Sequence, residues 1–187
     1  MKTILAMIIC ISLLTGAAWA APVLWSVADG GNGHWYDAVS SDMDWEAAVG
    51  VAGSLHYLGL QGHLATVTSQ EENDWILDSL GNVTGYFLGG TDLGPNEGTW
   101  TWITGEIWDY EYWNSGEPNN VAWLLPSGED ALLFASNGMW NDVPLTGYSE
   151  EGYIIEYEAA PVPEPTTMLL LCTGLFGLYG AKRKLRK

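Results

Sequence analysis

Three short segments in the second half of the chain are rich in hard oxygen donors. They are Glu117-Pro118-Asn119, Glu129-Asp130 and Trp140-Asn141-Asp142. Ca²⁺ prefers several carboxylate and carbonyl oxygens as ligands, and the proline holds Glu117 and Asn119 in a fixed turn. The segments predict a Ca²⁺ site that holds a ligand rather than transforming one.

The charge of the chain is distributed unevenly. All six Lys and Arg lie at position 2 or within 182–187, whereas 22 of the 23 Asp and Glu lie within 21–160. Nucleic-acid binding is excluded, because neutralising phosphates requires cationic side chains. Anionic polysaccharides are disfavoured unless a cation bridges them. A bound cation would also relieve the repulsion among the carboxylates.

The ends of the chain carry processing signals. Lys2, an apolar run and Ala18-Trp19-Ala20 predict a signal peptide over 1–20; a membrane anchor is the alternative. At the other end, Pro161 to Pro165 precede an apolar stretch, 166–181, and a basic tail, 182–187. The simplest interpretation of the C-terminal segment is a membrane anchor whose basic tail stays in the cytoplasm.

Residues 21–160 have the length of one domain with one core. Both cysteines, Cys10 and Cys172, lie outside this range, so we expect no disulfide in it. Ten of the 11 Trp lie inside it, where core packing is a commoner use of Trp than stacking on a sugar. The three His (His34, His56, His63) are scattered, and we expect no His metal site.

The domain is expected to be α+β, with two early helices followed by antiparallel strands. Helical spacing predicts a helix over 44–51. Ser69 and Glu72 form a capping box, which predicts a second helix that buries Trp75, Ile76 and Leu80 and stops at Gly81-Asn82. We expect two short strands within 25–36 and further strands at 62–67, 86–88, 99–103, 131–134, 139–140 and 153–157. The irregular stretch 104–128 is long for a compact domain, which favours a functional loop.

Residues 33–158 resemble a C-type lectin-like domain. The resemblance is carried by motifs whose order and spacing run through nearly the whole range: Trp45-Glu46-Ala47-Ala48, Gly62-His63-Leu64-Ala65-Thr66-Val67, Ser69-Gln70-Glu71-Glu72, Leu88-Gly89-Gly90-Thr91-Asp92, Trp100-Thr101-Trp102, 113–119, Trp140-Asn141-Asp142 and Tyr153-Ile154-Ile155-Glu156. The resemblance implies a C-type lectin-like fold with a long Ca²⁺-binding loop region.

The same resemblance implies two sets of Ca²⁺ ligands. The primary ligand set, which would also bind carbohydrate, is Glu117, Asn119, Glu129, Asn141 and Asp142. The secondary ligand set, for a structural ion, is Asp92, Glu97, Asn120, Glu129 and Asp130. The family's counterpart of Pro118 is in the cis form. A Glu-Pro-Asn triplet implies mannose-type sugars, whereas Gln-Pro-Asp would imply the galactose type.

Residues 162–187 resemble a PEP-CTERM sorting signal, with its Val-Pro-Glu-Pro motif, a single hydrophobic helix and a basic terminus. This implies that the domain at 21–160 is followed by a sorting signal at 161–187 that an exosortase recognises. The chain would then be exported, held transiently at the inner membrane by the C-terminal helix, and released to the cell surface or extracellular matrix, where a glycan or exopolysaccharide is the expected partner.

The chain departs from the family pattern at two places. Ala131 and Ile155 stand where the family has cysteines, so stability would come from the Trp-rich core and from Ca²⁺ binding. An apolar insertion at 121–126 adjoins the predicted site. Its Trp123 could stack on a sugar, pack internally or contact a partner.

Two other functional classes are considered. A glycosidase needs two carboxylates flanking a sugar bond, but the clustered carboxylates here resemble metal ligands and no nucleophile–base pair is evident. We therefore expect that the chain is not an enzyme. The second alternative is a matrix or adhesion protein that uses the fold for protein contacts and binds no sugar.

Overall fold

The computed structural model describes residues 21–121 and 128–158. The predicted signal peptide, the sorting signal and all of the insertion except Val121 lie outside these ranges. No helix within the two ranges is both long and apolar enough to cross a membrane. The predicted hydrophobic helix at 166–181 is outside them.

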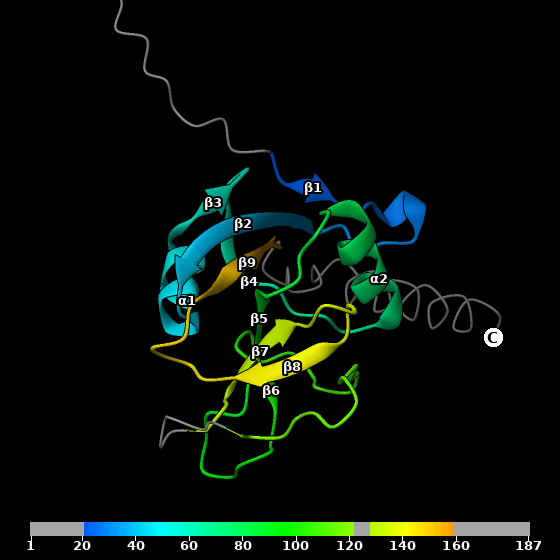
Figure 1. Ribbon diagram of the computed structural model, residues 1–187. Helices are drawn as coiled ribbons and strands as arrows, with labels where there is room; N and C mark the ends of the chain where they lie inside the picture. Colours follow the sequence, from blue (N-terminus) through cyan, green and yellow to red (C-terminus); the bar gives the residue numbers. More distant parts are fainter. Residues whose placement is uncertain (1–20, 122–127, 159–187) are drawn as a thin grey trace, which may run out of the picture.

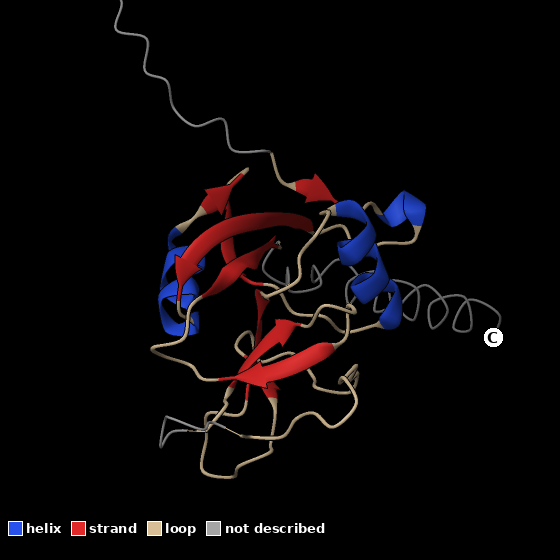
Figure 2. Cartoon of the chain, viewed as in Figure 1, coloured by secondary structure: helices blue, strands red, loops and turns tan. Residues whose placement is uncertain are grey.

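The described residues form two helices and a mixed sheet (Figures 1 and 2). The helices are α1 (Trp45–Ser54) and α2 (Gln70–Ser79), preceded by a 3₁₀ turn at Val27–Asp29. The strands are β1 (Val23–Leu24), β2 (Trp35–Met43), β3 (His56–Tyr57), β4 (Leu60–Leu64), β5 (Tyr86–Thr91), β6 (Thr101–Trp102), β7 (Ala131–Phe134), β8 (Trp140–Val143) and β9 (Glu150–Tyr157). The α+β prediction is confirmed.

Strand β9 lies at the centre of the sheet, whose main order is β1-β2-β9-β5-β7-β8. It pairs with β2 in antiparallel register, with Trp35 opposite Tyr157, which brings the two ends of the domain together. It also pairs with β4, and β3 and β6 pair at the sides with β4 and β5. The β5–β9 pair is parallel, so the expectation of an antiparallel sheet was wrong at this pair. Hydrophobic periodicity shows which residues face the core but carries no information on strand direction.

Helix α1 begins where the helical spacing predicted it. The Asp44 side chain accepts a hydrogen bond from the Ala47 backbone N–H at 3.0 Å, which caps the helix. Trp45, Ala48 and Ala52 are buried, at the three- and four-residue spacing of one helical face. The helix ends at Ser54, three residues beyond the predicted 44–51 range.

Helix α2 has only half of the predicted capping box. The Glu72 N–H donates to the Ser69 hydroxyl at 3.1 Å, as expected. The Glu72 carboxylate does not bond back to Ser69; it accepts from the Thr68 N–H at 2.8 Å, and its other oxygen bonds the Tyr36 hydroxyl. Glu72 is buried, so the core determines its position rather than the helix end. Of the three residues predicted to be buried, Ile76 is buried, whereas Trp75 and Leu80 are half-buried.

Trp140 of β8 fixes the irregular loop to the sheet. Its indole is fully buried and lies against the rings of Trp102, Trp108, Trp113 and Tyr110. Its indole N–H donates to the Asn73 side chain of α2 at 3.0 Å. Its backbone bonds Tyr112 and Asn114 on the loop, at 2.8 and 2.9 Å. Trp140 therefore holds the irregular loop against the sheet, and it directly precedes Asn141 and Asp142 in the chain.

We predict that Trp140→Phe destabilises the domain by about 2–4 kcal/mol, because it opens a cavity and leaves the buried Asn73 oxygen unpaired. The measurement is urea unfolding followed by far-UV circular dichroism. Ile107→Val is the matched control, since Ile107 lies on the same loop with 78% of its surface exposed; its change should stay within about 0.5 kcal/mol. Equal effects of the two substitutions would contradict the anchoring role of Trp140.

Candidate functional site

The Glu117–Asn119 turn is built onto strand β8. Trp113 bridges to Trp140, the Asn114 N–H donates to the Trp140 carbonyl, and the Glu117 N–H donates to the Asn114 carbonyl at 3.0 Å. The Glu117–Pro118 peptide bond is cis, the form that the family resemblance implies. Contacts that begin at a buried tryptophan thus lead directly to the first predicted ligands.

Asp142 orients this turn from the sheet side. Its carboxylate is buried and accepts the backbone N–H of Asn119 at 3.0 and 3.2 Å and that of Asn120 at 2.7 Å. Charged hydrogen bonds of this kind are stronger than neutral ones. The Asn119 amide in turn contacts the Glu117 carboxylate. Asp142 therefore brings Glu117 and Asn119 together beside itself.

Glu129 closes the site from the other end of the loop. Its carboxylate accepts the Val121 N–H at 2.8 Å, and its own N–H donates to the Asn120 side chain at 2.7 Å. Asn120 has a φ of +50°, and Gly128 packs against its side chain so closely that a Cβ at Gly128 would lie 2.5 Å from the Asn120 oxygen. Val121 and Gly128, which flank the undescribed part of the insertion, are thereby held near the ligands.

Four members of the primary ligand set are joined by these contacts: Glu117, Asn119, Glu129 and Asp142. Asn141, the fifth, is half-buried on β8 and donates its amide N–H to the Asp142 carbonyl at 2.8 Å. This bond leaves the Asn141 side-chain oxygen available as a ligand.

The carboxylates of the primary set repel one another. Desolvation and the neighbouring charge of Asp142 raise the pKa of Glu117. Desolvation also raises the pKa of Glu129, with a further contribution from Asp142 that the bond from Val121 opposes. A divalent cation between them would reverse this repulsion. The set therefore fits Ca²⁺ in donor type and in charge.

The secondary ligand set has a compact core at the β5–β7 edge. Asp92 follows β5, Asp130 precedes β7, and ligand atoms from these two residues and Glu97 lie within 4.8 Å of one another. Desolvation and the charge of Asp92 raise the pKa of both Glu97 and Asp130. Glu129 directly precedes Asp130 in the chain and donates its N–H to the Asn120 side chain, so these two residues join the core to the primary set.

Asp92 supplies an independent sign of a ligand at the secondary set. One of its oxygens accepts the Gly98 N–H at 2.9 Å. Its other oxygen, Oδ1, is buried and has no hydrogen-bond partner among the described residues. A buried carboxylate oxygen without a partner is costly, whereas a bound cation would satisfy it. The residues present thus fit a Ca²⁺ ion.

Sequence reasoning missed two features around these sites. The Thr91 hydroxyl donates to the Asp130 carbonyl at 2.6 Å and so positions the secondary set. His34 and His63, which looked scattered, both lie beside Glu158. The β4–β9 register, with His63 opposite Glu156, is the cause; only the paired strands could have revealed it. The role of Trp123 lies outside the described residues.

Comparisons with known proteins identify the family and the fold that this chain resembles. The family model for the C-type lectin domain matches residues 58–148, and that for the PEP-CTERM protein-sorting motif matches residues 161–184. Halomucin of Haloquadratum walsbyi is 31% identical over 139 residues, covering 67% of this chain and 1% of halomucin. A perlucin-like protein of Mytilus galloprovincialis is 36% identical over 100 residues, covering 50% of this chain and 60% of that protein. The chain therefore spans less than two thirds of the length of either relative.

Solved structures show the same fold. The cow CD23 carbohydrate-recognition domain, determined in the presence of a GlcNAc2Man3 oligosaccharide, has a TM-score of 0.59 and 27% identity, covering 69% of this chain and 91% of that one. The mouse scavenger receptor C-type lectin domain has a TM-score of 0.58 and 26% identity, covering 69% and 93%. The predicted lectin-like fold is confirmed.

Three general conclusions follow from the comparisons. C-type lectin domains bind carbohydrate and are not enzymes, so the expectation that the chain is not an enzyme is confirmed. Such domains generally bind Ca²⁺. The sorting motif indicates export to the surface or the extracellular space. The chain has a C-type lectin-like fold, with a match to the C-type lectin domain at 58–148 and to the PEP-CTERM sorting motif at 161–184.

Proposed function

We propose that the protein is a Ca²⁺-dependent lectin for mannose-type sugars. The observation that carries the proposal is the turn at Glu117-Pro118-Asn119, held by Asp142 beside Glu129. Its oxygens are the ligands that Ca²⁺ prefers. No Lys or Arg of 21–160 is available to pair with its carboxylates, because that range contains none.

Five residues of the chain would bind the ion, and two of them would also contact the sugar. Glu117, Asn119, Glu129, Asn141 and Asp142 would hold the ion, which supplies coordination positions for two vicinal hydroxyls. A hydroxyl both donates and accepts. Glu117 can accept its proton while the Asn119 amide donates to the same oxygen. This donor and acceptor order is what the family resemblance associates with mannose-type sugars.

The secondary ligand set would hold a structural Ca²⁺. Asp92, Glu97, Asn120, Glu129 and Asp130 are its proposed ligands, and the partnerless oxygen of Asp92 supports it most directly. Because Glu129 and Asn120 connect the two sets, filling this one would help to order the loop.

The termini support an exported protein. We propose that residues 1–20 are removed as a signal peptide and that an exosortase recognises 161–187, with transient anchoring in the inner membrane by the hydrophobic segment. The match of the sorting-motif model to 161–184 supports the exosortase step. The domain at 21–160 would then reach the surface or matrix, where glycans and exopolysaccharides are available.

We predict that Ca²⁺ raises the melting temperature and that EDTA reverses the rise. Ligand at about 100 times its dissociation constant stabilises a folded protein by about 2.7 kcal/mol. Asp92→Asn should remove part of this gain, since it takes a charge from the secondary set. Asp42→Asn is the matched control, because Asp42 is an exposed carboxylate on β2, outside both sets. A melting temperature indifferent to Ca²⁺ would contradict both proposed sites. Differential scanning calorimetry of the full chain provides the measurement.

We predict that Asn119→Asp abolishes binding to mannose-type sugars, because an acceptor replaces the amide donor, while the fold is retained. Surface plasmon resonance on immobilised mannan, with circular dichroism as the fold check, measures this. Asn82→Asp, an exposed change beyond the end of α2, should bind like the original protein. Unchanged mannan binding by Asn119→Asp would reject the assignment of this turn.

We predict that a glycan array probed with the full chain shows mannose-type binding in Ca²⁺ and none in EDTA. This experiment also separates the lectin from the matrix-protein alternative. Ca²⁺-independent capture of a protein partner, together with a blank array, would favour the alternative.

A further inference from the structure

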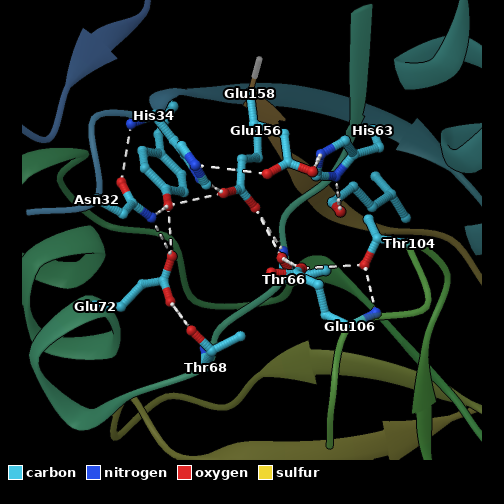
Figure 3. A network of polar contacts seen from close by, with 12 residues as sticks. Asn32, His34, His63, Thr66, Thr68, Glu72, Thr104, Glu106, Glu156 and Glu158 are labelled. Carbon is cyan, nitrogen blue, oxygen red and sulfur yellow. Dashed lines mark hydrogen bonds and ion pairs between the residues drawn. The ribbon is translucent and has the colours of Figure 1, made fainter. Parts of the chain in front are cut away.

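Two buried glutamates face each other across a tyrosine hydroxyl in the core. Glu72 on α2 is 2% exposed and Glu156 on β9 is 1% exposed. The hydroxyl of Tyr36, on β2, contacts Glu72 Oε1 and lies 3.0 Å from Glu156 Oε1. Figure 3 shows both glutamates, with His34 beside Glu156. The hydroxyl therefore connects the first turn of α2 to two strands of the sheet.

The Tyr36 hydroxyl has one hydrogen for these two carboxylates. The Asn32 side-chain amide donates to the Tyr36 oxygen at 2.7 Å, so it supplies no hydrogen to the contact between Tyr36 and Glu156. If both glutamates were ionised, one of the two oxygen–oxygen contacts would have no hydrogen in it. A hydrogen on Glu72 completes both contacts, because Glu72 then donates to Tyr36 and Tyr36 donates to Glu156.

Glu156 is the glutamate that the structure equips to stay ionised. It accepts from His34 Nδ1 at 2.5 Å and from the Thr66 backbone N–H at 3.0 Å. Glu72 accepts from the N–H and hydroxyl of Thr68, at 2.8 and 3.0 Å. Among the described residues it has no hydrogen bond or ion pair with a histidine. A buried carboxylate without a cation is costly and tends to take up a proton.

Three further titratable side chains border this network. Glu106, on the irregular loop, lies 2.5 Å from the Thr66 hydroxyl. Glu158, just beyond β9, lies 3.5 Å from His34, and His63 on β4 lies 3.6 Å from Glu158. All three are half-buried, so water screens their charges more than those of the two core glutamates. Neither Lys nor Arg can contribute from within 21–160, which contains none.

The directions of the pKa changes agree with this count of hydrogens. Desolvation and the charge of Glu156 raise the pKa of Glu72. Desolvation opposes protonation of His34, but the hydrogen bond to Glu156 outweighs it, so the pKa of His34 is raised. Desolvation also opposes the charge of Glu156, but the bond from His34 outweighs it and lowers the pKa of Glu156. The folded core thus favours a neutral Glu72 beside an ionised Glu156.

We propose that Glu72, Tyr36 and Glu156 form a proton-binding site in the core, in which Glu72 keeps its hydrogen at pH values where an ordinary carboxyl group has lost it. The bound proton links α2 to β2 and β9 and makes the domain more stable in mildly acidic than in alkaline solution. The site shares no residue with either Ca²⁺ set and does not depend on the proposed lectin function.

The direction of this pH dependence follows from the linkage between protonation and folding. The raised pKa of Glu72 contributes stability that is complete below about 4.5, its value in the unfolded chain, and is lost as the pH rises through its folded value. His34 acts in the same direction, starting from about 6.5. The lowered pKa of Glu156 acts oppositely, since its contribution is lost as the pH falls through its folded value. Between about pH 5 and pH 8 stability should therefore decline.

The test compares the melting temperatures of the full chain and of Glu72→Gln at pH 5 and pH 8, in excess Ca²⁺. The Gln amide can donate to Tyr36 as a protonated Glu72 does, but it does not titrate. We expect similar melting temperatures at pH 5 and a variant that melts at least about 3 °C higher at pH 8. Glu71→Gln is the matched control, because Glu71 is exposed on the same turn of α2; its difference from the original protein should be the same at both pH values. Contributions from other titrating groups cancel in these differences.

Infrared difference spectroscopy gives a second measurement, which detects the bound proton directly. At pH 6 the original protein should show the C=O stretch of a buried carboxylic acid, which Glu71→Gln keeps and Glu72→Gln loses. Absence of this band from the original protein would overturn the proposal without the need for any variant. Persistence of the band in Glu72→Gln would also overturn it, as would a melting-temperature difference for Glu72→Gln that is the same at pH 5 and pH 8.

Discussion

A domain without Lys or Arg must satisfy its carboxylates by other means, and this constraint shapes both halves of the structure. Glu156 is buried in the central strand and is satisfied by His34 and the Thr66 backbone N–H. Glu72 is buried beside it and bonds Thr68 and Tyr36. Burying a charge is tolerable only when such partners surround it. Among the described residues, the buried carboxylate oxygen that has no such partner is Asp92 Oδ1, in the secondary ligand set.

The loop carboxylates are positioned by packing that begins in the core. Trp140 joins α2, β8 and the irregular segment, and its chain neighbours Asn141 and Asp142 therefore enter the site from a rigid strand. Asp142 then orders the turn through backbone N–H groups. A binding site is most accurately held when its ligands rest on rigid elements. Because 21–160 contains no cysteine, this aromatic packing and these hydrogen bonds, rather than a disulfide, connect the loop to the sheet.

Sequence patterns predicted both helices, most strands and the irregular loop, because amphipathic spacing and capping residues act locally. They failed where a residue's role depends on a distant partner. Glu72 fits the sequence pattern of a capping box, but its carboxylate accepts a hydrogen bond from the buried Tyr36 hydroxyl. The parallel pairing of β5 and β9 has no local signature. The ligand types at 117–119, 129–130 and 141–142 were recognisable, but the orienting role of Asp142 required the fold.

The sequence by itself determined the charge, the absence of Lys and Arg from 21–160, the oxygen-donor motifs and the likeness to C-type lectins. These properties reside in residue types and in their spacing along the chain. Only the tertiary structure decided which oxygens remain without partners and which histidines meet. His34 and His63 are 29 residues apart by their numbers and reach one carboxylate solely because β2 and β4 both pair with β9. Strand pairing joins residues that are far apart in the sequence, so it is determined by the burial of the whole core rather than by any short segment.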